Sequence, residues 1–136
     1  MRPLFVRLTP FLAVIAIASC RNEITGIGFF PVRFAIQLSD TSGVVVSSGA
    51  MTLRTPDGRA VEGTYMLVPQ TEYPQTGPLE GTLHGDALDI SLGPFDATDS
   101  GRWLSGTVRG AVITGDWGYV TIAGRVRQGT FSSHGP

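Results

Sequence analysis

The chain has 136 residues, of which 42% are hydrophobic and 15% are charged, a size and composition that suit a single globular domain. Its 18 glycines and 9 prolines indicate an ordered, turn-rich fold rather than a charged helical bundle. The formal net charge is −1, and no run of charged residues exceeds two. This charge pattern excludes the basic surface of a nucleic-acid-binding protein and a polyelectrolyte tail.

The first nineteen residues are predicted to be an export signal rather than part of the fold. Arg2 and Arg7 precede a short apolar stretch, FLAVIAIA, and small residues follow it, which is the order found in export signals. The apolar stretch is far shorter than the roughly 20 residues that a membrane-spanning helix needs. It leads directly to the only cysteine of the chain, Cys20.

Residues 17–20, IASC, resemble the lipobox of bacterial lipoproteins, which has an aliphatic residue, two small residues and then cysteine. The resemblance implies that Cys20 is acylated and becomes the first residue of the mature protein. Arg21 stands where the family's inner-membrane retention signal is an aspartate, which implies an outer-membrane anchor facing the periplasm. The alternative is an ordinary signal peptide with an incidental cysteine. We expect residues 20–31 to form a lipidated tether and residues 32–136 to form the folded domain.

Beyond residue 30 the apolar residues recur at every second position, which predicts half-buried β-strands. The first example is VRFAIQL, where Val32, Phe34, Ile36 and Leu38 share one face. Eight strands are predicted, at residues 32–39, 44–54, 59–68, 78–84, 87–92, 103–109, 112–117 and 119–131. The apolar pattern of the last strand changes face, so we expect either a bulge near Arg127 or a ninth short strand there.

Two later stretches, LEGTLHGDALDISL from Leu79 and LSGTVRGAVITGDW from Leu104, match position by position. Each is predicted to be a hairpin whose two-residue turn begins with glycine, as type II′ turns do. The resulting register brings apolar residues opposite each other on one face, and a slip of one residue would turn them outward. The predicted pairs are Leu83–Leu88, Gly81–Ile90 and Leu79–Leu92, then Val108–Ile113, Gly106–Gly115 and Leu104–Trp117.

An earlier hairpin is predicted around the sequence TPDGR, with a three-residue turn that ends on a left-handed Gly58. This turn would pair Leu53 with Val61 and Met51 with Gly63.

A meander of eight strands with one apolar face removes its exposed edges when it closes. Glycines predicted to face inward, at 63, 81, 106, 115 and 129, favour closure because they permit strong coiling. We therefore predict an all-β fold, an antiparallel meander closed into a small up-and-down barrel, with a two-sheet sandwich as the alternative. In strand count and order the barrel resembles the avidin-like and lipocalin-like architectures, although no lipocalin motif or biotin-site pattern is recognised.

The lengths of the connections distinguish the two ends of this barrel. Turns two, four and six are minimal and fall at one end, whereas the long segments from Pro69 and Gly93 fall at the other, with turns one and seven. Loops and barrel mouths commonly carry ligand sites. The predicted ligand-binding residues are Tyr73, Phe95, Arg102, Trp103, Trp117 and Tyr119. The alternative is that the tryptophans only fill the barrel.

The sequence predicts no catalytic residue, no cofactor and no metal site. His84 and His134 have no second ligand at zinc spacing, and His84 with Asp86 and Asp89 lacks a serine nucleophile motif. The oxygen-rich residues 96–101 do not have the spacing of a calcium-binding loop. We expect a non-enzymatic envelope protein that binds a small apolar or aromatic ligand, or a peptide, at the mouth. The alternative is a structural or inhibitory protein whose long loops contact a protein partner.

Overall fold

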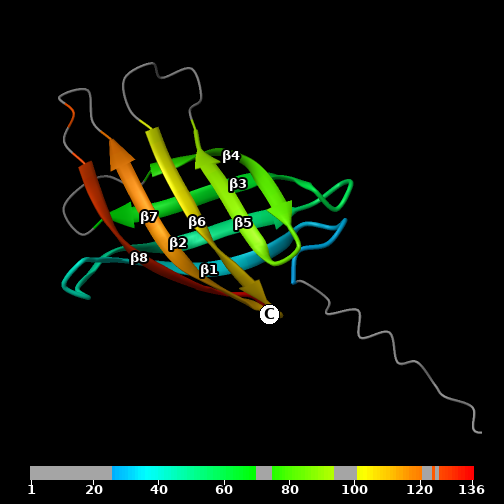
Figure 1. Cartoon of the computed structure of the whole chain (residues 1–136), viewed down its shortest axis with the longest axis horizontal. Helices are drawn as coiled ribbons and strands as arrows, with labels where there is room; N and C mark the ends of the chain where they lie inside the picture. Colours follow the sequence, from blue (N-terminus) through cyan, green and yellow to red (C-terminus); the bar gives the residue numbers. More distant parts are fainter. Residues whose placement is uncertain (1–25, 70–74, 94–100, 121–123, 125) are drawn as a thin grey trace, which may run out of the picture.

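The computed structural model of the chain describes residues 26–69, 75–93, 101–120, 124 and 126–136. These residues form eight strands: β1 (Val32–Asp40), β2 (Val45–Arg54), β3 (Ala60–Pro69), β4 (Gln75–His84), β5 (Ala87–Leu92), β6 (Gly101–Arg109), β7 (Val112–Val120) and β8 (Val126–His134). Consecutive strands pair antiparallel, and β1 pairs with β8, so the sheet closes into a barrel (Figure 1). The predicted all-β meander and its closure are confirmed, and the sandwich alternative is wrong.

The described residues contain no helix, and therefore none long and apolar enough to cross a bilayer.

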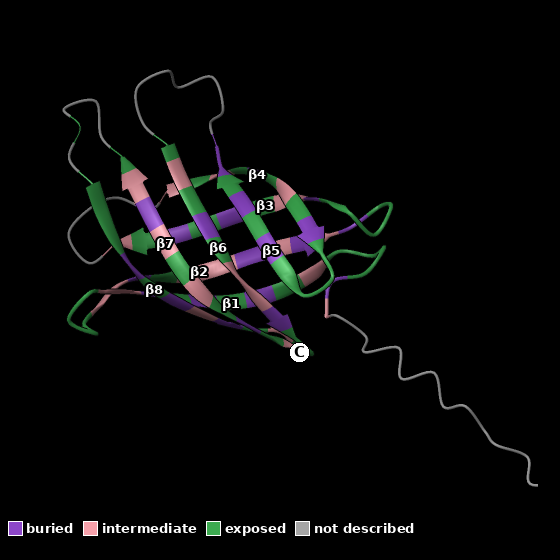
Figure 2. Ribbon diagram, in the orientation of Figure 1, coloured by how far each residue is buried: buried purple, intermediate pink, exposed green. Residues whose placement is uncertain are grey.

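Alternate side chains along each strand point into the barrel and form its core. On β5, Leu88, Ile90 and Leu92 are buried while the residues between them are exposed, and β1 has the same pattern (Figure 2). Burial of each large aliphatic side chain contributes roughly 1.5–3 kcal/mol. The period of two in the sequence therefore reflects one shared interior.

Six inward-facing glycines allow adjacent strands to approach each other more closely than other residues would. A Cβ atom on any of them would overlap a carbonyl oxygen of the neighbouring strand, for example that of Thr52 at Gly63 and that of Ser39 at Gly129. The six are Gly49, Gly63, Gly81, Gly106, Gly115 and Gly129. All five glycines predicted to face inward belong to this set, and Gly49 is an addition. Their close contacts permit the coiling that closes the barrel.

The predicted register of the two matched hairpins is confirmed in all six pairs. Gly85 and Gly110 have φ angles of 63° and 60°, and no non-glycine residue among the described ones has a positive φ. A positive φ at the first central position alone is the signature of a type II′ turn.

The predicted register of the β2–β3 hairpin is wrong by two residues. Leu53 pairs with Gly63 and Met51 pairs with Tyr65, so the ladder ends at Arg54 and Glu62, whose side chains form an ion pair. Thr55 does not continue the ladder because its N–H donates to the carbonyl of Gly28, 2.8 Å away. Gly58 does have the predicted left-handed conformation. A shift of two preserves which face each side chain occupies.

The last strand also differs from its prediction. β7 continues through Gly118 to Val120, and β8 begins only at Val126, so the change of face in the sequence marks a connection and not a bulge. β8 then extends to His134, which pairs with Ala35 and with Val112, whereas the last strand was predicted to end at residue 131. Similarly, β4 begins at Gln75, inside the segment predicted to be loop.

The end of the barrel with the short turns is closed by the residues that precede β1. Gly26 donates its N–H to the carbonyl of Gly110, at 2.8 Å, and the Gly28 carbonyl accepts from Thr55 across the same end. Between them, Ile27 is only 2% exposed and belongs to the core. We call this the closed end, and the opposite end the mouth (Figure 1).

The carboxylate of Asp57 holds the β2–β3 turn together at the closed end. It accepts hydrogen bonds from the N–H groups of Arg59 and Ala60, at 2.8 and 2.7 Å. Because these bonds favour the ionised form, first that from Arg59 and then that from Ala60, they lower the pKa of Asp57.

We predict that Gly63→Ala destabilises the protein strongly, because its Cβ would overlap the backbone of β2. Overpacking of a rigid interior costs about 1–3 kcal/mol or more, which a urea unfolding curve resolves as a lower midpoint. Gly28→Ala is the matched control, since a Cβ there meets nothing within 4 Å. Equal midpoints for the two variants would contradict the close-approach explanation.

We predict that the Asp57 carboxyl titrates below the ordinary aspartate value of about 3.9. Its lowered pKa means that the stabilisation of the turn is complete above that ordinary value and is lost as the pH falls through the lowered pKa. An NMR titration of the side-chain carboxyl carbon measures this midpoint. A midpoint at or above the ordinary value would refute the hydrogen-bonding role of this carboxylate.

Candidate functional site

The mouth contains a cavity of about 710 Å³, within the roughly 300–1,000 Å³ usual for small-molecule sites. The ends of the strands line it, with the apolar side chains of Leu38, Leu67 and Leu92 among its walls. These three side chains are also members of the buried core, so the cavity opens directly above the packed interior. The part of the barrel toward the closed end is filled by the remaining core side chains.

Trp117 lies inward from β7 and both lines the cavity and packs against the core. Its indole N–H donates to the carbonyl of Ser39 on β1, at 2.7 Å, across the intervening β8. The ring occupies the space beside Gly129, its partner on β8, where a Cβ would lie 2.8 Å from the indole nitrogen. The missing side chain at Gly129 therefore allows Trp117 to be held in place.

Arg102 and Tyr119 are directly paired on β6 and β7, and both line the cavity. The Cζ atom of Arg102 lies 4.7 Å from the centroid of the Tyr119 ring, within the range of a cation–π contact. The contact orients the guanidinium without neutralising it. Among the described residues the one ion pair is Arg54–Glu62, at the other end of the barrel.

Asp40 also lines the cavity, but its carboxylate is engaged by the β1–β2 turn. Oδ1 accepts from the hydroxyl of Ser42 at 2.6 Å and from the N–H groups of Ser42 and Val44 at 2.9 and 3.0 Å. These bonds, the Ser42 hydroxyl first, lower the pKa of Asp40 and keep it ionised. Among the described residues, the charged side chains that line the cavity are therefore those of Asp40, Arg102 and Arg127.

Two further polar groups lie at this end of the barrel. Ser47 faces inward beside the cavity, is 6% exposed, and its hydroxyl has no hydrogen-bond partner. A buried hydroxyl without a partner is uncommon and is often completed by water or a ligand. The hydroxyl of Tyr65 donates instead to the carbonyl of Gly93, and so ties β3 to the end of β5.

The structure brings three of the predicted ligand-binding side chains, Arg102, Trp117 and Tyr119, together at the cavity. Trp103 contributes to the rim, but its ring covers Gly118 on the outer wall of the barrel and is 40% exposed. Tyr73 and Phe95 lie outside the described residues, as does Cys20.

Sequence reasoning missed Ser47 and Asp40. A register for the β1–β2 pair would have found Ser47, which stands opposite the inward-facing Leu38. The irregularity between Leu38 and Ser39 obscures that register in the sequence.

The described residues contain no group of three or more histidine, cysteine or acidic side chains that could hold a metal ion. His84 is exposed beside its turn at the closed end, and Asp89 accepts a hydrogen bond from the Ser105 hydroxyl on the outer wall, at 2.5 Å. Of residues 96–101, the structure describes only Gly101.

No protein-family model matches the chain, and the search of curated proteins found no match. Solved structures of avidin-like proteins are similar in fold. The rhizavidin–biotin complex has a TM-score of 0.60 at 19% identity, covering 81% of this chain and 95% of rhizavidin. Apo short afifavidin has a TM-score of 0.61 at 20% identity, covering 82% of this chain and 99% of afifavidin. The bradavidin2–biotin complex gives 0.57 at 14% identity, with 79% and 99% covered. The predicted resemblance to avidin-like barrels is confirmed at the level of the fold.

Proposed function

We propose that this chain is a lipid-anchored binding protein of the bacterial envelope, which holds a small apolar or aromatic molecule with an acidic group in the mouth of its barrel. The observation that carries the proposal is the cavity of about 710 Å³, which Trp117 and the Arg102–Tyr119 pair line. The long loops could contact a protein partner instead, but a partner bound by loops alone would not require a cavity of this size.

The lining of the cavity supports an amphipathic ligand. Leucine side chains and the Trp117 ring offer apolar surface, for which removal of apolar area from water provides the main driving force. The half-buried guanidinium of Arg102 offers a fixed positive charge with several donors to a carboxylate or sulfonate. Asp40, an anion, does not attract an acidic group, and its Oδ1 is already bonded within its own turn.

Biotin is one ligand to test, because rhizavidin, short afifavidin and bradavidin2 were each solved as a biotin complex. It carries a carboxylate on an apolar chain, which fits the acidic group required here. Anilinonaphthalene sulfonate is a second probe, since it joins an aromatic body to an anion and reports its own binding by fluorescence.

We predict that Arg102→Gln weakens binding of anilinonaphthalene sulfonate about tenfold or more, because a hydrogen bond to a charged group contributes about 1.5–3 kcal/mol. A fluorescence titration of the two proteins measures the change. Arg109→Gln, the same substitution at the closed end, should bind the probe like the parent protein. The uncharged anilinonaphthalene should bind both variants equally.

Equal affinity of the Arg102→Gln variant and the parent for the sulfonate would contradict the proposed role of Arg102. An absence of binding by the parent to biotin and to the sulfonate would contradict the acidic-ligand proposal.

The anchor is part of the same proposal and is supported by the lipobox-like sequence that ends on Cys20. Removal of residues 1–19 and acylation of Cys20 would attach the barrel to the membrane through its N-terminal segment. Several acyl chains make such an attachment stable, whereas one chain gives only marginal binding.

We predict that intact-mass spectrometry of the protein from bacterial membranes finds a chain that begins at Cys20 and carries acyl groups. Cys20→Ser should carry no acyl group, because the modified sulfur is absent. A parent chain that retains residues 1–19, or that has a free Cys20 thiol, would overturn the anchor.

A further inference from the structure

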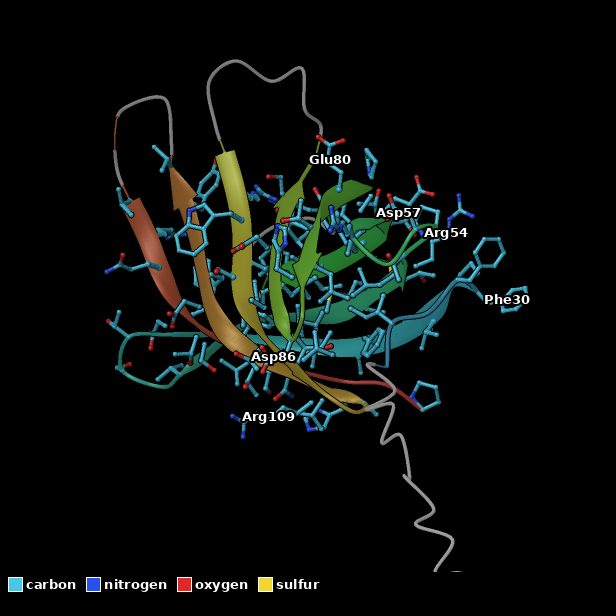
Figure 3. The ribbon with its side chains drawn as sticks, turned by 45° about the vertical axis from the view of Figure 1, so that its right-hand side comes forward. Phe30, Arg54, Asp57, Glu80, Asp86 and Arg109 are labelled. Carbon is cyan, nitrogen blue, oxygen red and sulfur yellow. The ribbon has the colours of Figure 1, made fainter. Side chains whose placement is uncertain are left out.

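Two aromatic side chains are exposed just before β1, at the closed end. Phe29 and Phe30 are 62% and 77% exposed, and their rings pack edge to face with centroids 5.4 Å apart. Phe30 projects away from the barrel beside the turn that contains Asp57 (Figure 3). Exposed phenylalanines of this kind are costly in water and mark a surface that meets another apolar phase.

The backbone that carries these rings is fixed to the barrel. The residues before them are held by the hydrogen bond from Gly26 to Gly110 and by the buried side chain of Ile27, and Thr55 holds Gly28. The two rings therefore have a defined position at the closed end.

The position of Cys20 in the chain brings the membrane to the same end. Five residues lie between Cys20 and Gly26, and a fully extended chain of these six steps reaches about 20 Å. A strand of nine or ten residues spans about 30 Å. An acylated Cys20 thus holds the bilayer surface close to the closed end, while the mouth lies a strand's length away.

We propose that the closed end rests on the bilayer surface through Phe29 and Phe30, so that the mouth faces the aqueous phase. Aromatic and apolar side chains enter the boundary between headgroups and acyl chains, and burial of each one adds to the attachment. In this orientation the ligand reaches the cavity from the water and not by lateral movement out of the bilayer. The inference rests on the proposed lipid anchor.

The test uses the lipidated protein, purified from membranes and reconstituted in vesicles of phosphatidylethanolamine and phosphatidylglycerol. Part of the lipid carries bromine near the top of its acyl chains, where it quenches tryptophan fluorescence on contact. Of the native tryptophans, Trp117 lies inside the mouth and Trp103 lies on the outer wall beside its rim, so the parent emission reports on the mouth and the adjoining wall. Phe30→Trp adds a reporter at the closed end, and Met66→Trp adds one at a residue of the β3 outer wall that is 43% exposed.

Brominated lipid should remove most of the emission that Phe30→Trp adds and shift it to the blue. The emission of the parent protein and of Met66→Trp should stay unchanged. Circular dichroism of each variant checks that the barrel is intact, and Phe30 is exposed enough to accept the larger ring.

Three outcomes would overturn the orientation. Quenching of the parent emission would put the mouth or the adjoining outer wall at Trp103 on the bilayer, and quenching of the emission that Met66→Trp adds, without that of the parent, would put the β3 wall there. An absence of quenching in every variant, with the protein still floating with the vesicles, would mean that the barrel stands away from the surface. Failure of the parent to float with vesicles would overturn the anchor as well, and so separates the two proposals.

Discussion

Close contact between neighbouring backbones at the inward glycines is the constraint on which this molecule depends. Where a Cβ would meet a carbonyl oxygen, as at Gly63 and Gly129, only glycine lets the strands coil enough to close. The same absence of a side chain at Gly129 makes room for the Trp117 ring, which the Ser39 carbonyl then holds in place. Closure of the barrel and the wall of its cavity thus have one steric origin.

The two ends of the barrel differ in how their interiors are filled. At the closed end, tight turns and the inserted Ile27 leave no room, and the interior there is packed. At the mouth, the strand ends surround a cavity with apolar walls and an oriented guanidinium. The proposed attachment at one end and the cavity at the other use different residues, so one small domain can accommodate both.

Much of the fold could be predicted because a meander has local rules. Alternation defines the inward face, and the type II′ glycines Gly85 and Gly110 set the hairpin registers. The predicted register of β2 and β3 failed because a distant segment competes with the local pattern. The Gly28 carbonyl accepts the N–H of Thr55, and the β2–β3 ladder is shifted by two residues. The position of Arg102 beside Tyr119 and the outward direction of Trp103 both follow from the register, whereas the packing of the Trp103 ring over Gly118 does not. Two of the residues predicted for the mouth, Tyr73 and Phe95, lie outside the described residues.

The pairing of β1 with β8 differs in kind from every other strand contact in the barrel. Seven of the eight pairs join neighbours in the sequence and close short loops, whereas Asp40 meets Gly129 and Ala35 meets His134. The entropic cost of closing a loop rises with the number of residues in the loop, and proteins with more contacts between distant residues fold more slowly. We therefore expect the meeting of the first and last strands to be the slowest step in forming the barrel. The indole N–H of Trp117 donates a hydrogen bond to β1 across β8 and so supports the β1–β8 pairing from inside the barrel.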